Sequence, residues 1–198
     1  KDQTEMLHYR LLPNPGLAPD MVLHGGRFVD DPEEGRVLEL SRDYEGGWGN
    51  RSELTCKGSY PNVTISLRFK AVDLKGTQVL YAQGGANKGY NIYLHEGKLY
   101  GGLVTAKEFV STDKVRAGQW HEAKLVLKNA TKKLEPRKLF LYLDGEEVAS
   151  GRGKMIPNHH AAPRIGTCLN TTLHTGEDIN GVGFRGRLAR FRQMNAAE

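Results

Sequence analysis

The chain has 198 residues, of which 38% are hydrophobic, and this length and composition fit one domain with a substantial core. We therefore expect a single domain over residues 1–198. No apolar run approaches the length of a membrane span and no stretch reads as a signal sequence, so membrane insertion is not expected. The 24 glycines follow no repeat period, which excludes a collagen-like chain and predicts many turns.

Short apolar runs separated by turn signals predict an all-β chain. Their residues alternate between apolar and polar with the period of two that is typical of half-buried strands. In chain order the runs are Leu7–Leu11, Arg36–Leu40, Val63–Phe69, Val79–Gln83, Tyr90–His95, Lys98–Leu103, Glu122–Leu127, Leu139–Leu143, Glu147–Ser150, Arg164–Gly166 and Gly186–Gln193. Regularly spaced short strands without helical periodicity indicate a sandwich or a barrel.

Two loops carry candidate binding residues. The segment "DYEGGWGNRS" displays Tyr44 and Trp48 among glycines, a pattern that predicts an exposed platform for stacking a sugar ring. The alternative is that Trp48 covers the core. The segment "IPNHHAAPR" places His159 and His160 near Arg164, with a group of surface polar residues as the alternative.

Residues 79–103 predict a three-strand antiparallel meander, because glycine-containing turns divide three alternating runs. If Tyr90 and Ile92 face the core, their neighbours on the same strand face the opposite way. A strand over Val63–Phe69 would add polar residues to that second face. The candidate ligand-binding residues of this surface are Arg68, Tyr81, Gln83, Asn91, Tyr93 and His95. Aromatic rings, amides and a guanidinium suit sugars, whereas the alternative is a polar face that only meets water.

The densest basic cluster is the segment "FRGRLARFR", which contains Arg185, Arg187, Arg190 and Arg192 in a chain of formal net charge +5. It predicts either a solvated strand face or a site for a polyanion such as a sulfated or uronic glycan. Base-stacking motifs of nucleic-acid-binding modules are not evident, so nucleic acid is not an expected partner.

The two cysteines, Cys56 and Cys168, stand too far apart in sequence for a zinc motif. They form either one long-range disulfide or two buried thiols. Four N-glycosylation sequons begin at Asn50, Asn62, Asn129 and Asn170. The sequons favour an exported protein that is secreted or extracellular, or periplasmic or at the cell surface if bacterial, and with it the disulfide.

Three local patterns together resemble a known family. The segment "GQWHEAKLVL" places Trp120 before an alternating strand, "KLFLYLDGEEVASG" contains Asp144-Gly145 at a type I′ turn, and "GFRGRLARFRQM" forms a closing strand. Their order resembles the laminin-G-like domains of the concanavalin A-like lectin/glucanase superfamily, over roughly Tyr9 to Met194. The resemblance implies a two-sheet antiparallel jelly-roll sandwich. That fold carries lectins, adhesion modules, enzymes and accessory domains, so function has to be argued from the site.

Catalysis is not the expected function. Glucanases of this superfamily carry a Glu-x-Asp-x-x-Glu motif on one strand, and the chain lacks it. The segment "RSEL", Arg51 to Leu54, resembles a strand motif of alginate lyases, for which Tyr93 and His95 would supply acid and base groups. The other motifs of those lyases are missing. We therefore expect no catalytic residues, with a lyase or hydrolase acting on acidic glycans as the alternative.

Calcium is the metal that the resemblance implies, because acidic loops supply hard oxygen ligands. The candidate ligands are Asp30, Asp31 and Asp178, in the segments "DDPEEG" and "GEDING". The closing strand has Ala189 where the family often has Asp, and self-solvated acidic turns are the alternative. No cofactor is required, with a structural calcium ion as the single candidate.

Together these patterns predict an exported, non-catalytic binding or adhesion module. A glycan is the first partner expected, acidic glycans included, and a protein is the second. The remaining alternative is an accessory domain that supports a larger extracellular protein.

Overall fold

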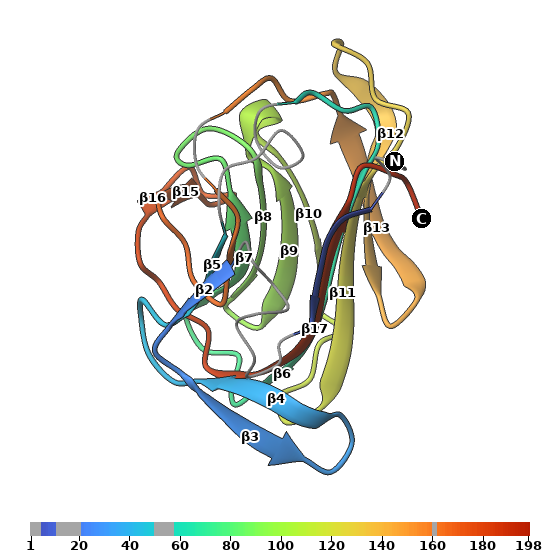
Figure 1. Ribbon diagram of the computed structural model, residues 1–198. Coiled ribbons are helices and arrows are strands. Elements are labelled where there is room, and N and C mark those ends of the chain that lie inside the picture. The colour runs from blue at the N-terminus through green and yellow to red at the C-terminus, as the bar shows by residue number, and fades with distance from the viewer. Residues whose placement is uncertain (1–4, 11–20, 50–57, 160–161) are drawn as a thin grey trace.

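The computed structural model describes residues 5–10, 21–49, 58–159 and 162–198, and only the backbone of residues 5–10 and 21. Two large antiparallel sheets face each other and form a sandwich (Figure 1). The predicted all-β, two-sheet antiparallel fold is therefore confirmed. No helix among the described residues is long and apolar enough to cross a membrane.

Sheet A has eight strands. In spatial order they are β13 (Glu146–Gly153), β12 (Glu135–Leu143), β11 (Trp120–Leu127), β6 (Val63–Ala71), β17 (Gly186–Met194), β4 (Gly35–Leu40) and β3 (Arg27–Asp31), with β1 (Glu5–Arg10) also paired to β17. One edge of β17 pairs with β6, and two strands pair with its other edge: β4 with its first residues and β1 with its last ones.

Sheet B has seven strands and faces sheet A. In spatial order they are β10 (Glu108–Thr112), β9 (Lys98–Leu103), β8 (Tyr90–His95), β7 (Thr77–Gln83), β14 (Arg164–Ile165), β5 (Gly46–Gly49) and β2 (Met21–His24). A short 3-10 helix, η2 (Val104–Ala106), follows β9, and β15 (Thr171–Thr172) pairs with β16 (Asp178–Ile179) in a separate hairpin.

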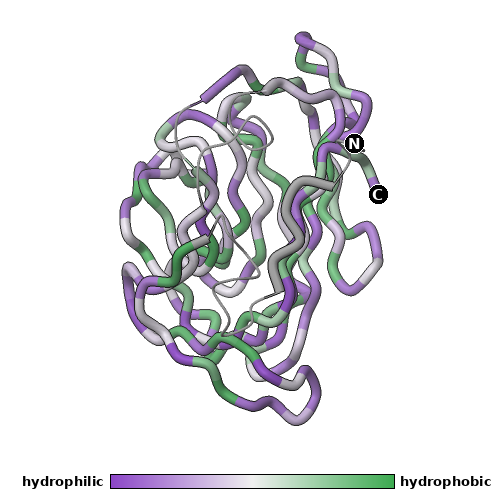
Figure 2. Tube along the Cα trace, viewed as in Figure 1, coloured by the Kyte–Doolittle hydropathy of each residue, from purple (hydrophilic) through white to green (hydrophobic). Residues whose placement is uncertain are grey.

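Alternation along the strands builds the core between the sheets. On β6, Ile65, Leu67 and Phe69 are buried, whereas the residues between them lie on the outer face. Part of β11 alternates in the same way, whereas all but the last residue of β8 is buried. Green and purple residues alternate along much of the chain trace (Figure 2). The inward residues of both sheets form one hydrophobic cluster, and removing its apolar surface from water is the main stabilising contribution to the fold.

The turn that was predicted as type I′ is confirmed. Asp144 and Gly145 both have positive φ, of 53° and 87°, and they connect β12 to β13 through a two-residue loop. Every strand predicted from the sequence is present, although β1 is described only as far as Arg10. Strands β2, β3, β5, β10, β15 and β16 were not predicted, because they are short or, in the case of β5, rich in glycine.

A bulge on β7 changes which residues face the core. The pairing of β7 with β8 shifts between Val79 and Tyr81, so both Leu80 and Tyr81 point into the main cluster. Val79 and Ala82 instead face the outside of sheet B. That outer face is covered by the β15–β16 segment, which adds Cys168 and Leu173 to a second small apolar cluster.

Candidate functional site

The predicted binding surface on the meander is buried. Asn91 and Tyr93 lie on the outer face of sheet B, as expected, but both are 0% exposed because the β15–β16 segment covers them. The side-chain amide of Asn91 donates to Thr171 Oγ1 at 3.0 Å and to the Thr172 carbonyl at 2.9 Å. The expectation that these two residues are exposed is therefore wrong.

The other residues of that predicted surface are dispersed. Tyr81 and Gln83 are buried between the sheets, where the Tyr81 hydroxyl is 3.0 Å from Gln193 Oε1 and Gln83 Nε2 is 2.8 Å from His159 Nε2. Arg68 lies on β6, on the outer face of sheet A, and so on the opposite side of the sandwich from Tyr93. The six candidates therefore do not form one surface, because their strands belong to two different sheets and their side chains point to different faces of these sheets.

His95 belongs to a cluster of rings at the edge of the β15–β16 segment. His174 stacks on Tyr100 with ring centroids 4.1 Å apart, and the imidazoles of His95 and His174 are 5.1 Å apart. The Tyr93 hydroxyl accepts a hydrogen bond from the His174 backbone N–H at 2.9 Å and lies 2.9 Å from His174 Nδ1. Burial, then His95 and Lys98, lower the pKa of His174, and burial raises that of Tyr93.

The basic cluster of the closing strand is neutralised within the protein. Arg185 pairs with Asp73 at 3.1 Å, Arg187 with Asp31 at 2.8 Å, Arg190 with Glu34 at 2.9 Å and Arg192 with Glu198 at 2.8 Å. A guanidinium already bound by a carboxylate attracts an external polyanion much less than a free one. The geometry therefore favours the interpretation of this segment as a paired strand face over that of a polyanion site.

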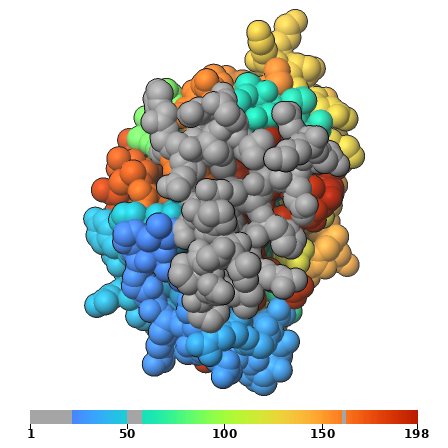
Figure 3. Space-filling view, in the orientation of Figure 1, coloured from blue at the N-terminus to red at the C-terminus, as the bar shows by residue number. Residues whose placement is uncertain are grey.

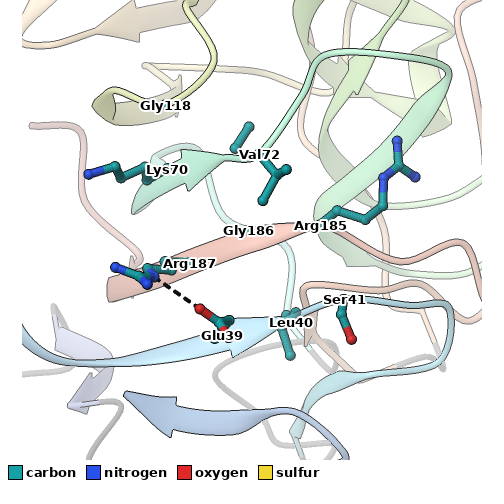
Figure 4. Close-up of a pocket in the computed structure, with 10 residues that line it drawn as sticks. Glu39, Leu40, Ser41, Lys70, Val72, Gly118, Arg185, Gly186 and Arg187 are labelled. Atoms are coloured by element: carbon teal, nitrogen blue, oxygen red, sulfur yellow. Dashed lines mark hydrogen bonds and ion pairs between the residues drawn. The ribbon is translucent and has the colours of Figure 1, made fainter. Parts of the chain in front are cut away.

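A pocket of about 530 Å³ opens on sheet A where β4, β17 and the end of β6 meet (Figure 4). Its floor is shaped by Gly186, since a Cβ there would lie 2.2 Å from the Lys70 carbonyl oxygen. Leu40, Ala71 and Val72 supply apolar wall, and Val72 is 72% exposed. The volume is within the range of sites that bind small molecules.

Polar groups of both kinds line this pocket. Glu39 accepts a hydrogen bond from Arg187 Nε at 3.1 Å, the contact drawn in Figure 4, and Ser41 lies beyond it on the same chain segment. Lys70 and Arg185 stand at other positions of the lining. Donors, acceptors and an apolar wall in one concave site can bind a hydroxyl-rich ring, because such a ring has apolar C–H faces and polar edges.

Trp48 lies in a stack of three side chains on the outer face of sheet B. His24 packs on its ring with centroids 3.6 Å apart, and the Arg164 guanidinium carbon is 3.9 Å from its ring centroid. These partners come from the strands on either side of β5, so they cover opposite faces of the indole. Trp48 is half-buried, and the open platform predicted for it is not present.

Tyr44 is 58% exposed, as predicted, and lies apart from the strands. It has a positive φ of 63°, and its ring packs over Gly181, where a Cβ would come within 2.1 Å of it. Its backbone N–H donates to the Gly181 carbonyl at 2.8 Å. The light-blue chain segment between β4 and β5, to which Tyr44 belongs, lies against the orange-red residues of the β15–β16 segment (Figure 3). One face of the Tyr44 ring is thus used to hold two segments together.

The predicted calcium ligands lie in two separate places. Both carboxylate oxygens of Asp31 already accept hydrogen bonds, from Arg187 and from Trp120 Nε1 among others. Asp30 forms an ion pair with Arg36, and Asp178 accepts from Thr172. Within residues 21–49, 58–159 and 162–198, no three His, Cys, Asp or Glu side chains are grouped to hold a metal ion. Calcium binding stays a prediction.

The cysteine and sequon predictions are only partly within the described residues. Cys168 is buried and forms no disulfide with a described residue, and burial raises the pKa of its thiol to about 11. Cys56, Asn50 and the segment from Arg51 to Leu54 lie outside the described residues. Asn129 and Asn170 are exposed, and Asn62 is half-buried, with its Oδ1 accepting from the Asn129 backbone N–H at 2.8 Å.

The sequence did not indicate the residues that shape the sheet A pocket. Glu39 and Ser41 stand at the end of an ordinary predicted strand, and Gly186 was noted only as part of a closing strand. Arg185 and Arg187 were identified as part of a basic cluster, which was the one signal that pointed to this place.

Comparisons with known proteins identify the fold alone. No protein-family model matches the chain, and no curated protein matches it in sequence. It is similar to the botulinum neurotoxin serotype D ligand-binding domain in complex with N-acetylneuraminic acid, with 14% identity, a TM-score of 0.68 and coverage of 99% of this chain and 48% of that one. The serotype G binding domain gives 10% identity, a TM-score of 0.68 and coverage of 98% and 48%. The chain thus spans about half of the neurotoxin domains.

A third similar structure is matched over nearly its whole length. This is domain 4 of AbnA, a GH43 extracellular arabinanase from Geobacillus stearothermophilus, in complex with arabinotriose. The identity is 16% and the TM-score 0.63, with coverage of 100% of this chain and 95% of that domain. Of these three β-sandwich domains, the serotype D domain and the arabinanase domain have structures with a bound sugar.

Proposed function

We propose that this chain is an exported, non-catalytic glycan-binding module of the laminin-G-like type, and that the pocket between β4, β17 and β6 receives the sugar. The observation that carries this proposal is the combination, in one pocket of about 530 Å³, of the Arg187–Glu39 pair with an apolar wall. A paired guanidinium and carboxylate offer donors and acceptors side by side, which is what adjacent sugar hydroxyls require.

The charges around the pocket favour a neutral sugar there. Lys70 pairs with Glu33 at 3.3 Å, and Arg185 and Arg187 each have carboxylate partners. Little positive charge is left to attract an acidic group, so binding at this pocket depends on hydroxyl hydrogen bonds and apolar contact. Arabinotriose, which is bound in the similar arabinanase domain, is a neutral oligosaccharide and supports this choice of ligand class.

The experiment is a glycan array run at two salt concentrations and followed by titration of the best neutral ligand. Val72→Trp fills the mouth of the pocket from an exposed position, and Leu169→Trp adds the same ring at another exposed apolar position. We expect the first variant to weaken binding by about tenfold or more and the second to leave it unchanged. Salt should have little effect on binding of the neutral ligand.

Three outcomes would contradict the proposal. They are binding to no glycan, equal weakening by both variants, and retention of binding in Val72→Trp. The first of these would favour a protein partner or a supporting role in a larger protein.

A further inference from the structure

Arg164 differs from every other arginine whose side chain the structure describes. The others form an ion pair with a carboxylate or, in Arg116, hydrogen bonds to backbone carbonyls. Arg164 has neither kind of contact among the described residues, and its buried Nε–H has no acceptor. Among the described residues no hydrogen bond from its two terminal amino groups is found, and the residue as a whole is half-buried. A cation left without an acceptor in a folded protein is a candidate for binding an external anion.

The position of Arg164 is fixed by stacking rather than by charge. Its guanidinium lies 3.9 Å from the centre of the Trp48 ring, and the imidazole of His24 supports the other face of that ring at 3.6 Å. Cation–π stacking holds a guanidinium flat and leaves the edge with its N–H groups free. The guanidinium of Arg164 is thus oriented before any ligand binds, which lowers the conformational entropy lost on binding.

No described group supplies the missing negative charge. Among the described residues, the ionisable group whose charge acts on Arg164 is the Cys168 thiol, and burial raises the pKa of that thiol to about 11, so it is neutral at pH 7. Burial lowers the pKa of Arg164, but a guanidinium stays charged at any physiological pH. Trp48 Nε1–H, in the ring on which Arg164 stacks, is also buried without an acceptor. Opposite Trp48 on β2, the side chain of Val22 is 58% exposed and adds apolar surface.

We propose that Arg164, held on Trp48, is a subsite for the carboxylate of an acidic sugar. The planar fork of a guanidinium matches the two oxygens of a carboxylate, and one carboxylate cancels the single unpaired charge. The exposed Val22 provides an apolar surface beside the site for a sugar ring. This subsite lies on the outer face of sheet B, whereas the pocket described above lies on sheet A. The two can therefore be tested separately.

The two tryptophans provide the measurement. Each indole N–H gives its own signal in an NMR spectrum of the ¹⁵N-labelled protein, and Trp120→Phe assigns them. Sodium glucuronate is added to the folded protein, with glucose and sodium chloride at matched concentration and ionic strength as controls. We expect a saturable shift of the Trp48 indole signal with glucuronate alone. The Trp120 signal should stay in place, because Trp120 Nε1 donates to Asp31 on the other sheet at 3.1 Å.

Two variants with the same change of charge decide the assignment. Arg164→Gln should weaken glucuronate binding by about tenfold or more, the loss expected for a charge-assisted hydrogen bond. Arg36→Gln removes an equal charge from an exposed position on β4 and should leave binding unchanged. An unchanged Trp120 signal shows that each variant is folded.

The proposal is overturned by any of three results. They are the absence of a saturable shift with glucuronate, an equal shift with glucose or sodium chloride, and equal affinity in Arg164→Gln. Each leaves the neutral-sugar pocket on sheet A untouched, since Val72→Trp tests that site on its own.

Discussion

At the scale of single residues, Gly186 illustrates how the absence of a side chain shapes the sheet A pocket. Its Cα approaches the Lys70 carbonyl so closely that a Cβ would lie 2.2 Å from the oxygen. The strand continues through this point because β4 and β6 pair with it from both sides. Backbone atoms are poorly able to move away, so a methyl group at this position must distort sheet A.

We therefore expect Gly186→Ala to lower the free energy of unfolding by about 2 to 3 kcal/mol. Urea denaturation measures the change. The matched control is Gly35→Ala, because Gly35 also has a positive φ, of 73°, but no atom lies within 4 Å of its added Cβ. That control should cost about 1 kcal/mol, from the left-handed conformation alone. Equal costs for the two variants would show that the contact with Lys70 is not what matters.

His174 makes the stability of the fold depend on pH. Its pKa is lowered below the ordinary value of 6.5 by burial, by His95 and by Lys98, so the folded state favours the neutral imidazole. The unfolded chain then binds a proton first as the pH falls, and stability is lost from about pH 6.5 downwards to the folded pKa. Protonation puts a hydrogen on both ring nitrogens, including Nδ1, which lies 2.9 Å from the buried Tyr93 hydroxyl.

We expect the melting temperature to fall between about pH 7 and about pH 5, and His174→Asn to show a smaller fall over the same range. Differential scanning calorimetry at several pH values gives the comparison. Identical pH profiles for the two proteins would contradict the role assigned to His174.

At the scale of elements, the β3–β4 hairpin is held to sheet A by its acidic residues. Asp31 accepts hydrogen bonds from Arg187, from Trp120 and from the backbone of its own turn. Burial alone would raise the pKa of Asp31, but these donors outweigh burial and hold it at about 2. The contribution of Asp31 to stability is therefore complete above about pH 4 and is lost as the pH falls towards 2.

Asp31→Asn should lower the free energy of unfolding by about 2 kcal/mol at neutral pH, since it leaves Arg187 and Trp120 with weaker acceptors. Its neighbour provides the control, because the Asp30 side chain is 86% exposed and its Arg36 partner is 3.5 Å away. Asp30→Asn should cost less than about 0.5 kcal/mol. Chemical denaturation at pH 7 tests both, and a neutral effect of Asp31→Asn would be the contrary result.

The β15–β16 segment is attached to sheet B through the Asn91 amide. Asn91→Ala removes two hydrogen bonds from a fully buried site and leaves the Thr172 carbonyl without its donor. We expect the free energy of local opening of residues 168–182 to fall by about 1 to 3 kcal/mol, seen as faster amide hydrogen exchange there. Strands β11 and β12 should exchange as before. Asn180→Ala, at an exposed position of the same segment, is the control and should change little.

At the scale of the whole molecule, the strands were predictable and their places in the sheets were not. Strands β6 and β8 both show the same alternation in sequence, so Arg68 and Tyr93 were expected on one surface. They lie on opposite sides of the sandwich, because sheet membership depends on contacts between residues far apart in the chain. The cover over Asn91 and Tyr93 also comes from residues some 80 positions later.

The candidate binding residues were predictable to different degrees. Trp48 was predicted to be an open platform, but its two stacking partners, which come from β2 and β14, cover both faces of its ring. That Arg164 lacks a carboxylate partner depends on which acidic residues approach it in space. Composition and spacing carry no such information, so Arg164 cannot be told from the other arginines of the sequence until the fold is known.

The predicted disulfide between Cys56 and Cys168 can be tested on the whole chain. Mass spectrometry of the non-reduced protein should give a mass two hydrogens below that of the reduced form if the bond is present. Two free thiols would contradict the prediction. In that case Cys168 should react slowly with alkylating reagents at neutral pH, because burial raises its pKa to about 11.

The order of strands in sheet A has a consequence for the speed of folding. Strand β17 lies between β6 and β4, yet it follows both of them by more than a hundred residues in sequence. Until it arrives, the hairpin of β3 and β4 has no partner in the sheet formed by β6, β11, β12 and β13. Closing such long loops is entropically costly and must precede the contacts that stabilise them. We therefore expect slow folding, limited by the docking of β17, with both of its edges exposed to other chains until then.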